Sequence, residues 1–400
     1  MKIGIDLRSL ESGEQHRGIG RYATELLEAL SNIDHSNEYV FFVSHPKALP
    51  PQFKLHKKFN YHNEAGKGEG LRGIKYIRIV YILPRSLSID KYGLDVFLQI
   101  DTLYSVKARK TPVVSVVYDL IPYIYKDQYQ HIHLGGYSPG HLIGYSRGKL
   151  RWKMLERQLD KYADAEQIIS ISEHSKKDLI SFVQGIQPER ITVTPLGPGS
   201  TKTAPKLSKR LTKLKTSSFL FYLGGADPRK GLVNFMKDME LIWQKYPTTN
   251  LVLAGKEIVD DKVAEARKLK RAIASSSKPQ QVHCFGYVSD SEMYWLYKNA
   301  AAFVFPSRYE GFGLPVLEAM MAGSPVVTYD NSSIPEVAGE ATALVKDGTS
   351  LAPAVNELLK SPNLRKQMVV AGKKQAAKFT WDKTARATLK VLETAAESKL

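Results

Sequence analysis

The sequence predicts an α/β fold of two domains, each built on a parallel sheet, and three observations support this prediction. Short apolar runs typical of buried strands alternate with amphipathic segments of helical period. Apolar residues make up 43% of the 400 residues, as in a protein that buries substantial cores. The strand pattern also starts again near residue 219, which indicates a second domain of similar size.

The expected strands fall into two groups. They cover residues 3–6, 40–44, 95–99, 113–118, 167–171 and 191–194, and then 219–223, 250–254, 282–285, 302–305 and 326–328. Between the groups, the Pro- and Gly-rich segment 195–200 precedes a basic stretch, 202–215, that is poor in apolar residues. We therefore expect domains over residues 1–197 and 198–378, with ligand loops at the carboxyl ends of their strands.

The formal net charge is 57 minus 40, or +17, which indicates attraction to an anionic partner. The segment 72–85 mixes basic residues with large apolar and aromatic ones. It predicts either the solvated face of an ordinary helix or a surface that lies on an anionic membrane. No nucleic-acid recognition motif accompanies the charge, so we do not expect a nucleic-acid partner.

The cysteine content and the apolar stretches of the sequence predict where in the cell the protein is located. The only cysteine, Cys284, cannot form an internal disulfide and lies in an apolar run, which predicts a buried structural thiol in a reducing environment. The chain opens on a strand rather than a signal peptide, and its longest nearly apolar stretch, 113–125, is too short to span a bilayer. We expect a cytoplasmic protein, attached peripherally at the inner membrane face if the basic surface meets a bilayer.

Residues 308–325 read RYEGFGLPVLEAMMAGSP and are the most informative stretch of the chain. An apolar strand precedes a glycine-rich turn that contains Glu310, and Pro315 suits the first position of the helix that follows. Glu318 would then lie in the first helical turn, where the helix dipole stabilises a carboxylate that accepts from hydroxyls.

The same turn offers backbone N–H groups to an anion. Gly311 and Gly313 let the backbone approach a ligand closely, and the N–H groups at the start of the helix face whatever anion lies there. The pattern favours a site for a sugar phosphate. On spacing alone, a plain strand, turn and helix with two solvated glutamates remains an equal alternative.

The run 303–327, continuing to 332–339, resembles the donor site of retaining glycosyltransferase family 4, whose signature is two glutamates eight residues apart. The resemblance implies the B-type glycosyltransferase fold, in which two Rossmann-like domains face each other across a cleft. It also implies that a C-terminal segment, 379–400, carries a helix that crosses back to the first domain.

The resemblance gives roles to the residues of the turn. Glu310 would orient hydroxyls of the transferred sugar, and Glu318 would hold the ribose of the donor. The contacts expected from the rest of the turn come from Gly311, Phe312, Gly313 and Leu314.

A second motif, 222–231, follows a strand and combines two glycines with adjacent cations. Arg229 and Lys230 can neutralise a diphosphate leaving group as its charge grows, which is also the role that the resemblance implies. Gly225 is a candidate for close approach to the donor. A solvated basic turn is the alternative. The resemblance further implies that the backbone around Val288 meets the nucleobase.

The first domain supplies the candidates for the acceptor side. Gly18 and Gly20 belong to an incomplete dinucleotide fingerprint, so a dehydrogenase is not expected; the resemblance implies contact with phosphate or acceptor. Tyr118 stands where many family members carry histidine next to the transferred sugar. It can donate a hydrogen bond but titrates near pH 10, so it is no acid or base near neutrality. Asp119 can bind an acceptor hydroxyl or simply cap a turn.

These observations predict a metal-independent, retaining hexosyltransferase. No Asp-x-Asp pair follows a suitable strand end and no His/Cys cluster has zinc spacing, so Arg229 and Lys230 would replace the divalent ion. We expect no cofactor beyond the nucleoside diphosphate sugar, with mannose from GDP-mannose favoured over UDP-sugars. The acceptor would be a glycan or lipid-linked precursor of cell-surface glycans. The alternative is a binding or regulatory subunit that has lost turnover, for which Tyr118 is the only support.

Overall fold

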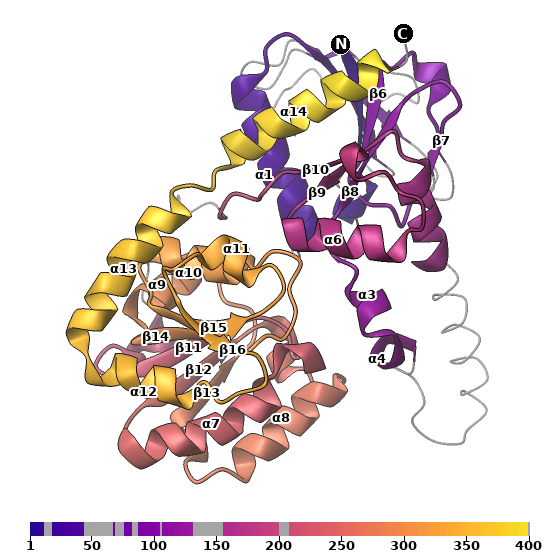
Figure 1. Cartoon of the computed structure of the whole chain (residues 1–400). Helices are drawn as coiled ribbons and strands as arrows, with labels where there is room; N and C mark the ends of the chain where they lie inside the picture. Colours follow the sequence, from indigo (N-terminus) through magenta and orange to yellow (C-terminus); the bar gives the residue numbers. More distant parts are fainter. Residues whose placement is uncertain are drawn as a thin grey trace. The chain divides into compact units, whose positions relative to one another are not determined.

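The computed structural model describes residues 1–11, 18–43, 67–68, 76–81, 87–104, 106–130, 155–199 and 208–398. The chain divides into two compact units. Unit 1 comprises Met1–Gly197 and Thr380–Leu400, and unit 2 comprises Pro198–Phe379. Figure 1 colours the chain along the sequence, so that unit 1 contains the indigo and magenta segments together with the yellow C-terminal helix.

Unit 1 contains an eight-stranded sheet of order β10-β9-β8-β6-β1-β2-β4-β3. All of its strand pairs are parallel except β3–β4. The strands are β1 (Lys2–Asp6), β2 (Glu38–Val43), β3 (Lys67–Gly68), β4 (Tyr76–Tyr81), β6 (Val96–Gln99), β8 (Val113–Val117), β9 (Gln167–Ser170) and β10 (Ile191–Val193). Two short strands, β5 (Leu87–Ser88) and β7 (Val106–Lys107), pair separately. The chain first moves to one side of β1 and then to the other, so the strand order reverses between β1 and β6.

The α-helices of unit 1 are α1 (Gly18–Ile33), α3 (Ile121–Ile124), α4 (Lys126–Gln130), α6 (Glu173–Phe182) and α14 (Trp381–Glu397). Residues 155–164 are also helical. The C-terminal helix α14 packs on α1 and on β6, β8 and β9. Its Thr384 hydroxyl donates to the carbonyl of Pro195 at 2.6 Å, and its Trp381 ring meets Tyr22 of α1 edge-on at 5.9 Å. Buried apolar side chains along one face of α14 therefore complete the core of unit 1.

Unit 2 is an all-parallel sheet of six strands in the order β13-β12-β11-β14-β15-β16. Its strands are β11 (Phe219–Leu223), β12 (Asn250–Ala254), β13 (Val282–Phe285), β14 (Ala302–Phe305), β15 (Val326–Asp330) and β16 (Ala343–Lys346). The central strands are continuous apolar runs because both of their faces are covered by helices. The strand order reverses between β11 and β14.

The α-helices of unit 2 connect these strands. They are α7 (Leu232–Lys245), α8 (Ala264–Ala274), α9 (Asp290–Asn299), α10 (Leu314–Ala322), α11 (Ile334–Ala338), α12 (Ala352–Lys360) and α13 (Pro362–Ala376). Short 3₁₀ turns include η6 (Lys209–Leu214), η7 (Pro228–Lys230) and η8 (Lys256–Val259). Figure 1 shows α12 and α13 on the outside of unit 2.

The predicted α/β fold with two parallel-sheet domains is confirmed, and each expected strand is present within a few residues. The interpretation of residues 72–85 as a helical surface is wrong for Tyr76–Tyr81, which form β4 beside β2. The residues YIRIVY are β-branched and aromatic except for one arginine, and such residues favour a strand. Residues 72–75 and 82–85 lie outside the described part of the chain, as do residues 202–207 of the basic stretch.

The prediction of a buried thiol is also wrong, because Cys284 is exposed. It lies on β13, the strand at one edge of the unit 2 sheet, which pairs only with β12. A short apolar run does not distinguish a central strand from an edge strand, and edge strands are covered on fewer sides. Over the described ranges, no helix has the length and apolar character needed to cross a bilayer.

Candidate functional site

Two loops meet at the carboxyl edge of unit 2, where the strand order reverses between β11 and β14. Open α/β sheets bind ligands at such a reversal because the loops of the two central strands diverge there. The first loop turns at Asp227, whose carboxylate accepts from the N–H of Arg229 at 3.0 Å. It ends at Gly231, which has φ 69° and whose Cβ would lie 2.3 Å from the carbonyl of Pro306. Only glycine lets these loops approach so closely.

The contact between the loops assembles Arg229, Lys230 and Glu310. Oε1 of Glu310 accepts from Nζ of Lys230 at 2.5 Å, from Nη1 of Arg229 at 3.1 Å and from Oγ of Ser307 at 2.5 Å. Arg229 also donates to the carbonyl of Tyr309 at 2.6 Å. Within the described residues, Oε2 of Glu310 has no hydrogen-bond partner. One carboxylate oxygen is therefore held by the protein, and the other can accept from a ligand hydroxyl.

The electrostatics of this cluster follow from burial and from the neighbouring charges. Burial alone would raise the pKa of Glu310, but Lys230 and Arg229 hold that pKa below its ordinary value. Burial lowers the pKa of Lys230, and the adjacent Glu310 opposes this shift. Glu310 is only 8% exposed, so these are charge-assisted bonds in a largely water-excluded site. Asp227 lies 3.8 Å from Nε of Arg229, so the formal charges of the two cations are balanced by two carboxylates.

A third loop, after β15, holds the backbone of Glu310 in place. The hydroxyl of Ser332 accepts from the N–H of Glu310 at 3.0 Å, and that of Ser333 donates to its carbonyl at 2.9 Å. Asn331 donates to the carbonyl of Ser307 at 3.3 Å. Ser332 has φ 47°, a left-handed conformation that costs a non-glycine residue about 1 kcal/mol or more. The loop after β15 therefore holds Ser332 in a strained conformation in which its hydroxyl bonds to Glu310.

Glu318 does not lie in the first turn of its helix, as the sequence predicted. Helix α10 starts at Leu314 with Pro315 in second place, so Glu318 is its fifth residue and belongs to the second turn. Helix-dipole stabilisation falls off within the first turn, so it contributes less here than expected. Glu318 is 5% exposed, and Tyr297 of α9 donates to its Oε2 at 3.4 Å.

The glycine-rich turn before α10 is largely buried. Gly311, Phe312 and Gly313 are buried, and Leu314 is half-buried. The ring of Phe312 packs edge-on against Phe379 at 5.9 Å within unit 2. Gly313 has φ 97°, and a Cβ there would meet Ile334 at 2.7 Å. Packing therefore fixes the backbone of this turn.

Gly225 and Val288 lie on loops of the same edge, after β11 and β13, which are separated by β12. A Cβ at Gly225 would lie 2.5 Å from Oε2 of Glu257, which accepts from the N–H of Ala226 at 3.3 Å. The group that lies close to Gly225 in this structure is thus the carboxylate of Glu257. Val288 is 7% exposed and directly precedes the capping box of α9.

In unit 1 the structure brings Tyr118 beside the start of α1, the helix that begins with Gly18 and Gly20. The rings of Tyr118 and Tyr22 meet edge-on at 5.3 Å. The helix starts at Gly18, so both glycines lie in its first turn. Burial raises the pKa of Tyr118 well above its ordinary value, and its hydroxyl has no hydrogen-bond partner in the described part of the chain.

Asp119 takes part in a local turn. Its Oδ1 accepts from the N–H of Ile121 at 3.0 Å, just before α3. This is the capping geometry that the sequence left open as an alternative to acceptor binding.

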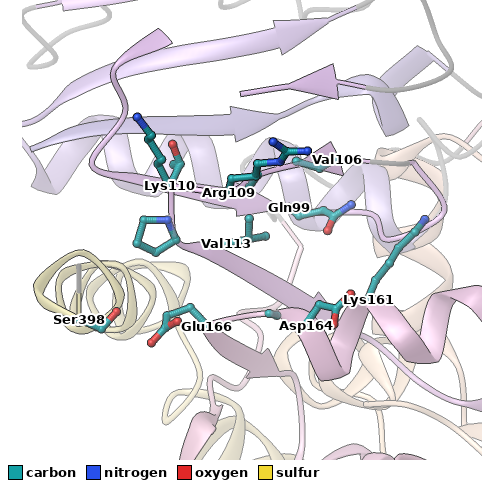
Figure 2. A pocket seen from close by; sticks show the side chains of 13 residues that line it. Gln99, Val106, Arg109, Lys110, Val113, Lys161, Asp164, Glu166 and Ser398 are labelled. Carbon is teal, nitrogen blue, oxygen red and sulfur yellow. The ribbon is translucent and has the colours of Figure 1, made fainter. Parts of the chain in front are cut away.

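Unit 1 also contains a cavity of about 330 Å³ (Figure 2). Its lining includes the cations Arg109, Lys110 and Lys161 and the carboxylates Asp164 and Glu166. Lys161 donates to two backbone carbonyls at 2.5 and 3.2 Å, which occupies part of its donor capacity. None of the residues that the sequence singled out lines this cavity, and its mixed charges define no particular ligand.

Sequence reasoning missed the residues that support Glu310. Ser307 lies three residues before Glu310, and this short spacing could have predicted the hydrogen bond between the two side chains. Ser332 lies 22 residues away, and nothing in the sequence indicates its hydrogen bond to the turn. Within the described ranges, no cluster of three or more His, Cys, Asp or Glu side chains is arranged to hold a metal ion.

The chain has the α/β fold of two Rossmann-like domains that is also found in solved B-type glycosyltransferases. Sucrose-phosphate synthase from Thermosynechococcus elongatus superposes with a TM-score of 0.70 at 17% identity, covering 100% of both chains. WaaG, a glycosyltransferase involved in lipopolysaccharide biosynthesis, superposes with a TM-score of 0.58 at 13% identity, covering 98% of this chain and 99% of that one. At these identities the likeness concerns the fold alone.

Residues 204–375 match the family model of glycosyl transferases group 1. The chain is 29% identical to O-antigen chain mannosyltransferase B of Escherichia coli over 60% of this chain and 64% of that protein. It is 24% identical to the serotype-specific mannosyltransferase WbdA of Escherichia coli over 96% of this chain and 47% of that protein. The chain thus spans less than two thirds of the length of these relatives. The comparisons support the glycosyltransferase superfamily, and the narrower family 4 remains a prediction.

Proposed function

We propose that this protein transfers a hexosyl group from a nucleoside diphosphate sugar to an acceptor hydroxyl, with retention of the anomeric configuration. The observation that carries the proposal is the cluster of Arg229, Lys230 and Glu310 at the reversal point of the unit 2 sheet. The two cations lie between Asp227 and Glu310, and the second oxygen of Glu310 can accept from a ligand at the edge where open α/β sheets bind ligands. The cations can bind the negatively charged diphosphate, and the carboxylate oxygen can accept hydrogen bonds from sugar hydroxyls.

Each residue of the cluster then has a distinct task. Arg229 and Lys230 stabilise the diphosphate as it leaves, when its negative charge is greatest. Glu310 orients the transferred sugar through Oε2, because Oε1 is held by the cations and by Ser307. Glu318 accepts from the ribose, and the turn Gly311–Leu314 and the backbone at Val288 complete the donor site. The two cations do the work of a divalent ion, so the reaction proceeds without metal.

Mannose is the sugar we favour, with GDP-mannose as donor, because the mannosyltransferase relatives support it. UDP-sugars are the alternative, since the Anabaena protein HepE, which shares the fold with a TM-score of 0.67, was solved with UDP-glucose. The acceptor that fits is a glycan or a lipid-linked precursor of cell-surface glycans, handled in the cytoplasm or at the inner membrane face.

Unit 1 supplies the acceptor side of the proposal. Asp119 and Tyr118 follow the carboxyl end of β8, and Gly18 and Gly20 begin α1 next to Tyr118. These residues would meet the acceptor or the transferred sugar. The burial of the Tyr118 hydroxyl favours the second candidate function, a binding or regulatory subunit without turnover, because it limits contact with a ligand.

A donor-turnover assay tests the proposal. Purified protein is incubated with GDP-mannose or UDP-glucose and a mixture of glycan acceptors, with and without a chelator, and release of the nucleoside diphosphate is measured. We expect release from one donor at a rate that the chelator does not change. Nucleotide binding without any turnover would favour the binding subunit, and loss of turnover with the chelator would overturn metal independence.

A further inference from the structure

One surface of unit 2 is strongly basic and has no role in the proposed donor site. Residues 358–381 carry six lysine and arginine side chains and no aspartate or glutamate. Six of the 17 excess positive charges of the chain therefore lie within 24 residues. Most of this stretch is helix α13, which lies on the outside of unit 2 (Figure 1).

Three lysines of α13 have no counter-charge. Lys366, Lys373 and Lys374 are exposed, and within the described residues they make no ion pair and no hydrogen bond. On α8, by contrast, two exposed lysines form ion pairs with neighbouring carboxylates. Helix α14 has three cations and three carboxylates, so its charges balance. Because like charges repel, the uncompensated lysines of α13 would be stabilised by an anionic partner.

An exposed apolar side chain lies among these lysines. Val370 is 70% exposed, and it follows Lys366 by four residues and precedes Lys373 and Lys374 by three and four. Residues at these spacings are neighbours on one helix face. Lys373 has a local role as well, since its Cε would lie 2.9 Å from a Cβ at Gly323, at the C-terminal end of α10, where the helix dipole favours a cation. We call Lys366, Val370, Lys373 and Lys374 the α13 surface.

The opposite face of α13 anchors the helix to unit 2. Gly372 and Ala376 are buried, and a Cβ at Gly372 would lie 3.3 Å from the side chain of Met320 in α10. Gln375 donates to the carbonyl of Val337 in α11 at 3.0 Å. The helix is therefore held against the core of unit 2, and its lysine face is directed towards solvent.

We propose that the α13 surface docks this protein on the anionic surface of a phospholipid bilayer. The lysine ammonium groups attract acidic lipid head groups, and Val370 enters the apolar boundary beneath them. A nucleic acid would match the charge but not Val370, and α13 has no aromatic ring on which a base could stack. The inference goes beyond the proposed function, because docking needs neither a nucleotide sugar nor turnover.

Vesicle sedimentation of the full chain tests this proposal. We expect binding to vesicles that contain phosphatidylglycerol, and no binding to vesicles of phosphatidylcholine alone or in about 1 M salt, where the screening length is about 3 Å. The combined replacement Lys366→Gln, Lys373→Gln and Lys374→Gln should weaken binding about 100-fold, since each lysine near an anionic bilayer strengthens binding about fivefold. Val370→Ser should weaken it about fivefold, because less apolar area leaves water on binding.

The matched control lies on α14. The combined replacement Lys383→Gln, Arg386→Gln and Lys390→Gln also removes three exposed cations, so the net charge falls equally, but these cations belong to a helix with balancing carboxylates. It should weaken vesicle binding less than about threefold. All of the substituted side chains are exposed, so each variant should melt within about 2 °C of the unsubstituted chain.

Three results would overturn the proposal. Equal weakening by the two triple replacements would leave only a general attraction by net charge. A failure of the unsubstituted chain to bind phosphatidylglycerol vesicles would exclude lipid docking, and binding to poly(U) RNA in its place would assign the α13 surface to nucleic acid. Unchanged vesicle binding by Val370→Ser would show that no side chain enters the bilayer. Turnover of the donor is measured separately in solution, so its absence would overturn the proposed function and leave lipid docking intact.

Discussion

Replacing Glu310 by glutamine isolates the charge at the centre of the candidate site. The amide oxygen of glutamine can still accept hydrogen bonds, but it carries no negative charge. Asp227, 3.8 Å from Nε of Arg229, would then remain as a carboxylate neighbour of the two cations. The substitution therefore leaves a nearly buried cation without a counter-charge while the shape of the site changes little.

The contacts of Glu310 set the size of the effect. Removing one partner of a buried ion pair costs about 3–5 kcal/mol, and Asp227 retains part of the compensation for Arg229. We expect the lower end, about 3 kcal/mol, which in a domain of this size lowers the melting temperature by about 6–12 °C. Unit 2 should remain folded at 25 °C, because domains are commonly stable by about 5–15 kcal/mol.

A diphosphate should reverse this loss. Its oxygens supply the negative charge that Lys230 and Arg229 lack in the variant, so Glu310→Gln should bind a nucleoside diphosphate about tenfold more tightly than the unsubstituted chain, or by about 1.4 kcal/mol. Turnover should nevertheless fall at least about 100-fold, because an amide is neutral and has one oxygen instead of two, so it cannot bond to Lys230 and also accept from the sugar as the carboxylate does.

Thermal denaturation with and without GDP or UDP, together with donor turnover, checks these expectations. Glu357→Gln is the matched control, because Glu357 is an exposed carboxylate on α12 whose side chain makes no hydrogen bond within the described residues. A Glu310→Gln variant that melts within about 2 °C of the unsubstituted chain would refute the reasoning. So would an equal ligand-induced shift in both proteins, because the carboxylate would then not be competing for the cations.

Three further outcomes follow from the structure. Lys230→Met should lower kcat/KM for the donor about 100-fold or more by removing a charge-assisted contact to the leaving group, and unchanged kinetics would exclude that contact. The hydrogen bond from Arg210 lowers the pKa of Glu292 to about 2, so this pair stabilises the fold above pH 4.5 and the stabilisation is lost as the pH falls towards 2. Because the Arg210 side chain is partly exposed, Arg210→Ala should lower stability by only about 0.5–1 kcal/mol at pH 7 in urea titrations, and the gap should close at low pH; a gap independent of pH would contradict this origin. Tyr118→Phe removes a buried hydroxyl that has no partner in the described part of the chain, so the melting temperature should rise by an amount that corresponds to about 1 kcal/mol, and a fall would show that the hydroxyl is bonded.

Most of the strands could be predicted from the pattern of apolar residues over short segments. The strands of both sheets are visible as short apolar runs, since burial on both faces requires side chains of one kind over consecutive positions. The failures occur where that signal is ambiguous. Tyr76–Tyr81 form a strand although their basic neighbours suggested an amphipathic surface, and Cys284 is exposed because its apolar run lies at a sheet edge.

The sequence by itself determined the fold class and the residues that carry charge at the candidate site, because residue type and spacing along one loop record both. Only the tertiary structure decided that Glu310 shares one oxygen with Lys230 and Arg229, which lie some 80 positions earlier. It alone also added the supporting hydroxyls of Ser307 and Ser332. These contacts join loops that follow different strands, and the order of strands in the sheet determines which loops meet.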